Sequence, residues 1–81
     1  MTADAERAAV VQLRRAAFGS RLRQLRVARG LSQEGLAERA GVDRSHYAEI
    51  ETGKHSPRVD WVYDVAAALE VHVSELFGEP A

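Results

Sequence analysis

The chain has 81 residues, a formal net charge of −1 and no cysteine. A chain of this length makes one small domain, which buries only about 60% of the surface that its unfolded form exposes. Disulfides and thiolate metal sites are excluded, and no apolar run comes near the roughly 18 residues that a membrane span needs. We therefore expect a soluble, cytoplasmic protein with one small core, to which oligomerisation would be a natural supplement.

Charge is unevenly distributed along the chain. Residues 1–30 carry seven arginines and two acidic residues, whereas residues 55–81 carry one arginine and five acidic residues. The electric field of such an uneven charge distribution steers the approach of a charged partner even when the net charge is close to zero. A basic half can face phosphates while an acidic half faces solvent or a partner, although solvated helix faces would give the same counts.

Alanine and arginine dominate residues 5–17 and predict a helix with Val10 and Leu13 on one stripe. This segment is a helix packed on the core, a dimerisation element or a frayed basic arm. We favour a packed or partner-bound helix, because Val10, Val11 and Leu13 would otherwise lie in water. Gly19 then either breaks the helix or lets it run on into the next one.

The next helix has an apolar stripe at helical spacing, formed by Phe18, Leu22 and Leu25. Arg29 places a cation in its last turn, and Gly30 follows as a terminating glycine. We expect the helix to end at these two residues.

Residues 31–54 contain two short apolar faces separated by a glycine. The first face is formed by Leu36, Ala37 and Ala40, and the second, after Gly41, by Val42, Tyr47 and Ile50. Small Ala37 and flexible Gly41 allow two helices to meet at a steep angle over a short turn. Ser32 and Asp43 supply an N-cap for each helix, so the stretch predicts a helix-turn-helix.

Pro57 disfavours helix at Ser56, so the following helix should begin at about Val59. Its apolar face includes Trp61. We expect this ring in the core or at a dimer interface rather than stacked on bases, because it lies in the acidic half. A last short helix should begin at Ser74.

The sequence offers little for catalysis. The three histidines, His46, His55 and His72, are not at metal-ligand spacing. The chain also has no nucleophile elbow, zinc-protease motif or glycine-rich phosphate loop. We therefore expect no enzyme activity, no cofactor, no metal and no small-molecule ligand.

Several of these residues together form a recognisable pattern. They are Gly30, Leu31, Ser32 and Gln33, then Leu36 and Ala37, Gly41 and Val42, Ile50, Glu51 and Gly53, and finally Pro57. With this pattern the chain resembles the lambda-repressor-like, Xre-type family of bacterial and phage DNA-binding domains from about residue 18 to residue 77. The resemblance implies an all-α, lambda-repressor-like five-helix domain that contains the helix-turn-helix, with an additional N-terminal helix or arm. It divides the chain into an N-terminal helical extension (1–17), the helix-turn-helix DNA-binding domain (18–78) and a disordered tail (79–81).

Glu51 lies near the end of the second helix of the motif, where a carboxylate opposes the helix dipole. The resemblance explains its presence, since the family pairs this glutamate with an arginine of the first helix. The matching residue here is Arg26. We expect a largely buried, structural ion pair between the two side chains.

The resemblance also implies that the second helix of the motif, residues 44–52, reads DNA in the major groove. The candidates for base contacts are Arg44, Ser45 and Glu49. Arg44 in the first turn suits a bidentate contact to guanine, and Glu49 either accepts from cytosine or selects against other sequences. The candidates for contacts to the DNA backbone are Gln33, His46, Thr52 and Lys54. Gln33 matches the family residue that grips a phosphate at a helix N-terminus.

One recognition helix reads about half a turn of duplex, which is too little for specificity against a genome. We therefore expect a homodimer that binds a pseudo-palindromic operator in double-stranded DNA. The candidate dimer interface consists of apolar residues from the last third of the chain, namely Trp61, Val62, Val65, Leu69, Leu76 and Phe77.

A free-standing domain of this length is most similar to the controller proteins of restriction-modification systems or to a small phage-type repressor. Such proteins regulate transcription by blocking or recruiting RNA polymerase, which makes the polymerase a further expected partner. The alternative is an antitoxin-like protein-binding module with secondary DNA binding. The N-terminal extension would support that alternative.

Overall fold

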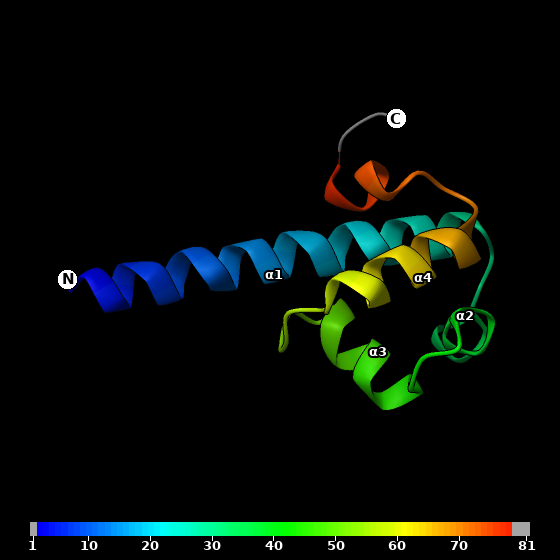
Figure 1. The fold of residues 1–81 in the computed structure, drawn as a ribbon, viewed down its shortest axis with the longest axis horizontal. Coiled ribbons are helices and arrows are strands. Elements are labelled where there is room, and N and C mark those ends of the chain that lie inside the picture. Colours follow the sequence, from blue (N-terminus) through cyan, green and yellow to red (C-terminus); the bar gives the residue numbers. More distant parts are fainter. Residues whose placement is uncertain (1, 79–81) are drawn as a thin grey trace.

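The computed structural model describes residues 2–78, and in this part of the chain it is all-helical (Figure 1). Four α-helices are followed by a short 3-10 helix. They are α1 (Ala3–Ala28), α2 (Gln33–Ala40), α3 (Arg44–Glu51), α4 (Val59–Leu69) and η1 (Val73–Phe77). The predicted all-α class is confirmed. The tail at 79–81 lies outside the described residues.

The helix-turn-helix consists of α2, α3 and the three residues between them. The hydroxyl of Ser32 accepts a hydrogen bond from the Gly35 amide (2.9 Å), and the Asp43 carboxylate accepts one from the His46 amide (2.8 Å). Both predicted N-caps are therefore present. Gly41 ends α2 with a φ of 70°, a left-handed conformation that costs glycine little.

Gly19 does not break the first helix, and α1 runs unbroken through it. A Cβ atom at Gly19 would lie 2.6 Å from the carbonyl oxygen of Ile50 and closer still to that of Glu51. The glycine is therefore needed where α1 crosses the end of α3. The expected N-terminal extension is the first half of α1 and not a separate helix. Figure 1 shows it projecting past the other helices.

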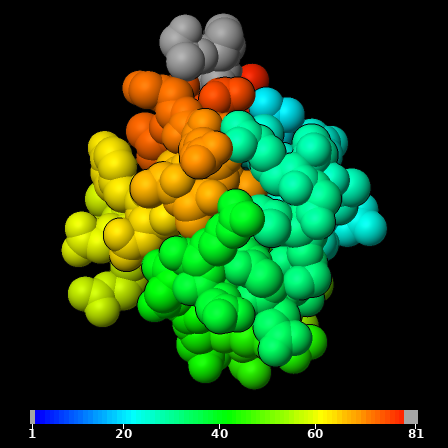
Figure 2. All heavy atoms as spheres, turned by 90° about the vertical axis from the view of Figure 1, so that its right-hand side faces the viewer, coloured from blue at the N-terminus to red at the C-terminus, as the bar shows by residue number. Residues whose placement is uncertain are grey.

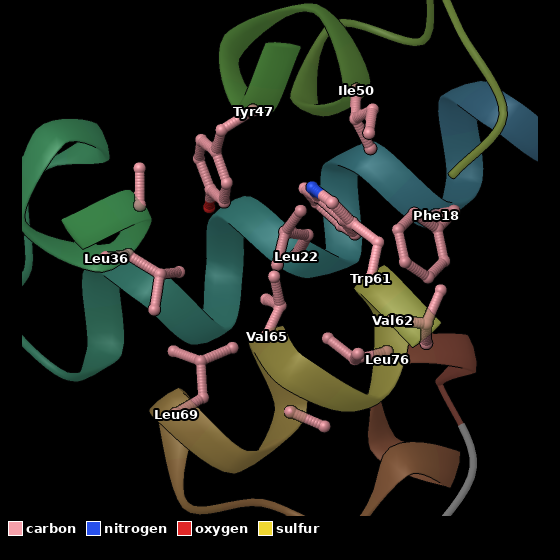
Figure 3. Packing of buried hydrophobic residues seen from close by; sticks show 12 residues of the cluster. Phe18, Leu22, Leu36, Tyr47, Ile50, Trp61, Val62, Val65, Leu69 and Leu76 are labelled. Atoms are coloured by element: carbon pink, nitrogen blue, oxygen red, sulfur yellow. The ribbon is translucent and has the colours of Figure 1, made fainter. Parts of the chain in front are cut away.

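The core lies between α1 and the other four helical segments, and each element contributes side chains to it (Figure 3). Its members are Phe18, Leu22, Leu36, Ala37, Tyr47, Ile50, Trp61, Val62, Val65, Ala66, Leu69 and Leu76. The rings of Tyr47 and Trp61 stack with their centroids 5.8 Å apart. Leu76 is fully buried and fixes η1 against α1 and α4.

This core corrects the expected dimer interface. Five of its six candidates are buried within one chain, namely Trp61, Val62, Val65, Leu69 and Leu76. They leave almost no surface for a partner, because α2 and η1 already pack against α4. Phe77 differs, since 61% of it is exposed.

The basic and acidic parts of the chain touch each other instead of occupying opposite faces. Arg29, which follows the last residue of α1, forms an ion pair with Glu70 (3.3 Å), and Arg21 of α1 donates a hydrogen bond to the carbonyl oxygen of Glu75 (2.8 Å). Part of the basic charge on α1 is thus directed at the acidic half.

In the described residues, the helices are all too short or too polar to cross a membrane.

Candidate nucleic-acid interface

The helix α3 divides into a buried face and a solvent face. Tyr47, Ile50 and Glu51 are buried against the core. Ser45 and Glu49 are one turn apart and point to the other side, as helical spacing requires. Figure 2 shows α3 at the lower end of the molecule, away from η1 at the upper end. The solvent face of α3 is therefore open to a large partner.

Arg44 stands in the first turn of α3 and reaches back to α2. Its Nη1 atom lies 3.4 Å from Oε2 of Glu34, and about two thirds of each side chain is exposed. An ion pair this exposed contributes only about 0–1 kcal/mol. Arg44 can therefore exchange Glu34 for another acceptor at little cost.

Glu49 is held by a residue outside the helix. The Nε2 atom of His55 lies 2.6 Å from Oε2 of Glu49. The His55 ring stacks on His46, with centroids 6.0 Å apart, and His46 in turn meets the edge of Trp61. No helical spacing in the sequence predicts this position of His55, because the loop after α3 folds back over the helix. His46 is half-buried in this stack and does not extend freely toward a phosphate.

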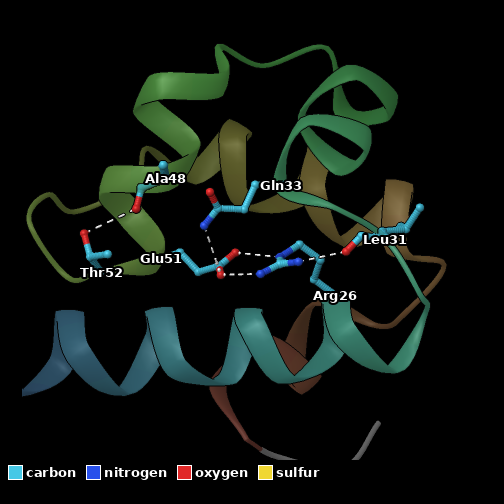
Figure 4. Close-up of polar contacts among 6 residues, drawn as sticks. All are labelled: Arg26, Leu31, Gln33, Ala48, Glu51 and Thr52. Atoms are coloured by element: carbon cyan, nitrogen blue, oxygen red, sulfur yellow. Dashed lines mark hydrogen bonds and ion pairs between the residues drawn. The ribbon is translucent and has the colours of Figure 1, made fainter.

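The far end of α3 is anchored by the Arg26–Glu51 ion pair (Figure 4). Arg26 donates from Nε to Oε2 of Glu51 (3.0 Å) and from Nη2 to Oε1 (2.8 Å), which makes the pair bidentate. A third donor, Nη1, reaches the carbonyl oxygen of Leu31 (2.8 Å). The side chain of Glu51 is only 2% exposed. The pair thus joins α1 to α3 and to the start of α2.

Burial alone would raise the pKa of Glu51, but the hydrogen bonds from Arg26 and Gln33 outweigh it and lower the pKa below its ordinary value of 4.5. The hydrogen bonds that Arg26 donates to this carboxylate raise the pKa of Arg26 in turn. Both side chains are therefore charged at neutral pH. The pair is a buried salt bridge whose charges each need the other.

Gln33 adds a contact that the sequence did not reveal. Its amide nitrogen donates to Oε1 of Glu51 (3.3 Å), so the side chain turns inward instead of standing free at the start of α2 (Figure 4). One amide hydrogen is left for an outside acceptor. Thr52 is also engaged, since its hydroxyl donates to the carbonyl oxygens of Ala48 and Glu49 at the end of α3. Lys54 is exposed on the loop that follows.

The first half of α1 supports this loop. Gln12 donates to the carbonyl oxygen of Gly53 (3.2 Å), and Arg15 donates to the hydroxyl of Ser56 (2.8 Å). Gly53 has a φ of 81°, and a Cβ atom there would lie 3.3 Å from the backbone of Ala16. The extension thus positions the segment that carries Lys54 and His55.

Within residues 2–78, no cluster of histidine and acidic side chains is arranged to hold a metal ion.

A capped short helix, a tight turn and a second helix with one buried and one open face define a helix-turn-helix protein. A family model described as a helix-turn-helix domain matches residues 17–76. The chain belongs to this family, and the resemblance to repressor-type regulators is confirmed.

Relatives and solved structures agree with the family. The immunity repressor protein of Bacillus phage phi105 is 39% identical over 61 residues, which are 75% of this chain but only 42% of the repressor. Control protein C.MunI of Mycoplasma sp is 36% identical over 63 residues, covering 76% of this chain and 85% of that protein. The crystal structure of the restriction-modification controller protein C.AhdI from Aeromonas hydrophila matches with a TM-score of 0.77 and 43% identity, over 78% of this chain and 96% of C.AhdI.

Proposed function

We propose that this protein is a sequence-specific DNA-binding transcriptional regulator that places α3 in the major groove of an operator. The observation that carries the proposal is the division of α3. Its solvent face presents Arg44, Ser45 and Glu49, while its other face and its end are fixed by the core and by Glu51. A rigidly held helix with exposed polar residues at its start suits the reading of base edges.

Each reader residue has a chemical role in this proposal. Arg44 leaves Glu34 and donates two guanidinium N–H groups, one to O6 and one to N7 of a guanine. Ser45 bonds to a base or a phosphate. Glu49 accepts from a cytosine amino group or excludes other bases at its position.

The backbone contacts are assigned to residues around the ends of α2 and α3. Lys54 and Thr52 approach phosphates beyond the end of α3, and Gln33 uses its second amide hydrogen at the start of α2, where the helix dipole favours an anion. His46 contributes from the edge of the helix. These contacts fix the register of α3 in the groove without carrying sequence information.

We further propose that the protein binds a pseudo-palindromic operator as a homodimer. The proposed dimer surface consists of Val59, Tyr63 and Phe77, each of which is more than half exposed. They line a shallow depression of about 230 Å³ together with Val62 and Val73. Exposed aromatic side chains around an apolar depression are typical of protein interfaces. This surface replaces the buried candidates of α4.

The relatives C.MunI and C.AhdI are named as control proteins, and the phage relative as a repressor. We propose that this chain likewise acts at promoters, in the cytoplasm, by blocking or recruiting RNA polymerase. The antitoxin-like alternative gains no support from these relatives.

The test is to incubate the purified protein with random DNA duplexes and to sequence those it retains. We expect an enriched pseudo-palindrome, and an affinity for it that falls steeply with salt concentration as counterions are released. A retained pool with no enriched sequence, or no retention even at low salt, would overturn the proposal.

A further inference from the structure

We propose that a groove along the first half of α1, between this helix and η1, is a docking site for a partner protein. The partner offers an amphipathic helix with acidic side chains along one edge. Docking in this groove is a second function of the protein, separate from the reading of DNA by α3.

Two adjoining depressions form the docking groove, and they share Arg14, Phe18 and Phe77 as lining residues. One has a volume of about 450 Å³ and lies between α1 and the end of η1. The other has a volume of about 350 Å³ and extends along α1 to Arg7. From Arg7 to Arg21 the groove follows α1 over about 21 Å, at 1.5 Å per residue. This length matches about four turns of a helix lying beside α1.

The floor of the docking groove is apolar. Figure 3 shows Phe18 and Val62 side by side at one edge of the core, and both line the second depression together with Val11. Phe77 forms a wall, with its ring centroid 5.3 Å from that of Phe18, yet 61% of the residue is exposed. An exposed aromatic ring beside an apolar floor is a surface that the apolar side chains of a partner can cover.

The rim of the docking groove is basic. Its lining residues include four arginines and no acidic residue, and the arginines are Arg7, Arg14, Arg15 and Arg21. Arg15 and Arg21 donate hydrogen bonds to Ser56 and to the carbonyl oxygen of Glu75. Arg7 and Arg14 are exposed and form no ion pair with another residue of 2–78. The groove therefore complements a partner that is both anionic and apolar.

The spacing of the arginines favours a helical partner. Arg7, Arg14 and Arg21 repeat every seven residues and so form one stripe along α1. A helix packed along α1 repeats at the same interval, and glutamates seven residues apart on its edge would each meet one arginine. A second copy that offered its own α1 would set arginines against arginines. The geometry therefore favours an acidic helix of another protein.

The docking groove and the recognition helix lie on different sides of α1. Ala16 and Gly19, which meet Gly53 and the end of α3, stand about 140–160° from Arg14 around the helix. Figure 1 likewise shows η1 and α3 on opposite sides of α1. The phosphates of DNA would also attract the arginines, but they have no apolar groups to cover the floor. A duplex on α3 leaves the groove free, so DNA and the partner helix can be bound together.

The experiment uses the full chain and a fluorescein-labelled peptide of about 18 residues, above the length at which isolated helices are marginal. The peptide has leucines at three- and four-residue spacing and flanking glutamates every seven residues. Fluorescence anisotropy at constant ionic strength measures its dissociation constant, and we expect saturable binding. A scrambled peptide of the same composition, and a peptide with lysine in place of each glutamate, should bind at least about tenfold more weakly.

Two matched pairs of variants on α1 locate the bound peptide. Arg14→Glu should weaken binding about tenfold, because a repulsion replaces an attraction. Arg23→Glu makes the same change of charge outside the groove and should stay within about twofold of wild type, since solvent and salt screen it. Val11→Ser should weaken binding about fivefold through lost apolar contact, whereas Val10→Ser, on another side of the helix, should change it little. Circular dichroism checks that each variant stays helical.

The same variants separate the docking of a partner protein from other uses of the groove. Arg14→Glu and Arg23→Glu should have equal affinity for the selected operator and should sediment like wild type. A loss of DNA affinity specific to Arg14→Glu would make the groove a DNA surface, and a specific change in its monomer–dimer equilibrium would assign the groove to a second copy. Either result contradicts the proposal, as does equal binding of the acidic peptide by the two variants.

Failure of the docking groove and failure of the proposed function give different results. A wild-type protein that selects an operator but binds the acidic and the scrambled peptide alike refutes the docking groove alone. A protein that discriminates between the peptides as expected but selects no operator refutes the proposed function alone.

Discussion

Arg26 and Glu51 form the polar contact on which the orientation of α3 depends. Glu51 is buried, the side chain of Arg26 is only 12% exposed, and the charged pair is bidentate. Removing one partner leaves the other charge stranded in the interior, which costs far more than an exposed pair contributes.

We predict that Arg26→Ala lowers the free energy of unfolding by about 3 kcal/mol, measured by urea denaturation. Arg23→Ala, an exposed residue on the same helix, is the matched control and should change stability little. Equal stability of Arg26→Ala and wild type would show that the ion pair does not hold the domain together.

The lowered pKa of Glu51 predicts how this contribution depends on pH. A carboxylate whose pKa is lower in the folded state stabilises the protein fully above its ordinary pKa of 4.5, and this stabilisation is lost as the pH falls through the folded pKa. The melting temperature of wild type should therefore exceed that of Glu51→Gln near neutral pH and approach it in acid. A constant difference between the two melting curves across this range would be the contrary result.

At this scale the sequence predicted some roles and missed others. Glu51 stood out because it opposes the helix dipole, and the resemblance supplied Arg26 as its partner. The inward turn of Gln33 and the reach of His55 to Glu49 had no such signal, because both depend on how separate segments are placed in space.

At the scale of elements, the most informative contact is the crossing of α1 and α3 at Gly19. In a free helix interior, glycine is about 1 kcal/mol less favourable than alanine. Here an added methyl group would collide with the backbone at the end of α3. The higher helix propensity of alanine would stabilise the protein, whereas the collision would destabilise it. The backbone of α3 cannot move away from the methyl group as a flexible side chain would.

We predict that Gly19→Ala destabilises the protein by about 1–3 kcal/mol, the usual cost of overpacking. Ser20→Ala, next to it on the exposed side of α1, should leave stability unchanged or slightly higher. Thermal melts of the two variants provide the comparison. A Gly19→Ala protein as stable as wild type would mean that α1 and α3 do not cross so closely.

The sequence predicted most helix ends because they depend on local chemistry. Ser32, Asp43 and Pro57 mark ends that the structure shares. The sequence did not decide whether α1 continues through Gly19, because this depends on a contact with a distant part of the chain. The cost of a helical glycine is visible in the sequence, but the backbone that requires it lies more than thirty residues away.

At the scale of the whole molecule, the apolar residues of the C-terminal third have two uses. Their spacing correctly indicated a buried face on α4, but spacing does not distinguish a chain's own core from a partner's surface. The structure assigns five of the six candidates to the core and leaves Phe77 outside with Val59 and Tyr63.

We predict that Phe77→Ser weakens dimerisation about tenfold, as expected for an aromatic residue near the centre of an interface. Sedimentation equilibrium over a range of concentrations measures this. Leu13→Ser removes an equally exposed apolar side chain on α1, outside the proposed dimer surface, and should leave the dimer intact. The dimer surface is wrongly placed if Phe77→Ser dimerises as well as wild type or if Leu13→Ser is the weaker dimer.

The most direct test of base reading by Arg44 compares the DNA affinity of wild type with that of Arg44→Lys, on the selected operator and on a scrambled duplex. Lysine keeps the charge but cannot form the bidentate contact to guanine. We predict that Arg44→Lys loses about 1–3 kcal/mol of affinity for the operator while its affinity for the scrambled duplex stays the same. Equal affinities of the two proteins for both duplexes, or an equal loss on both, would contradict the account.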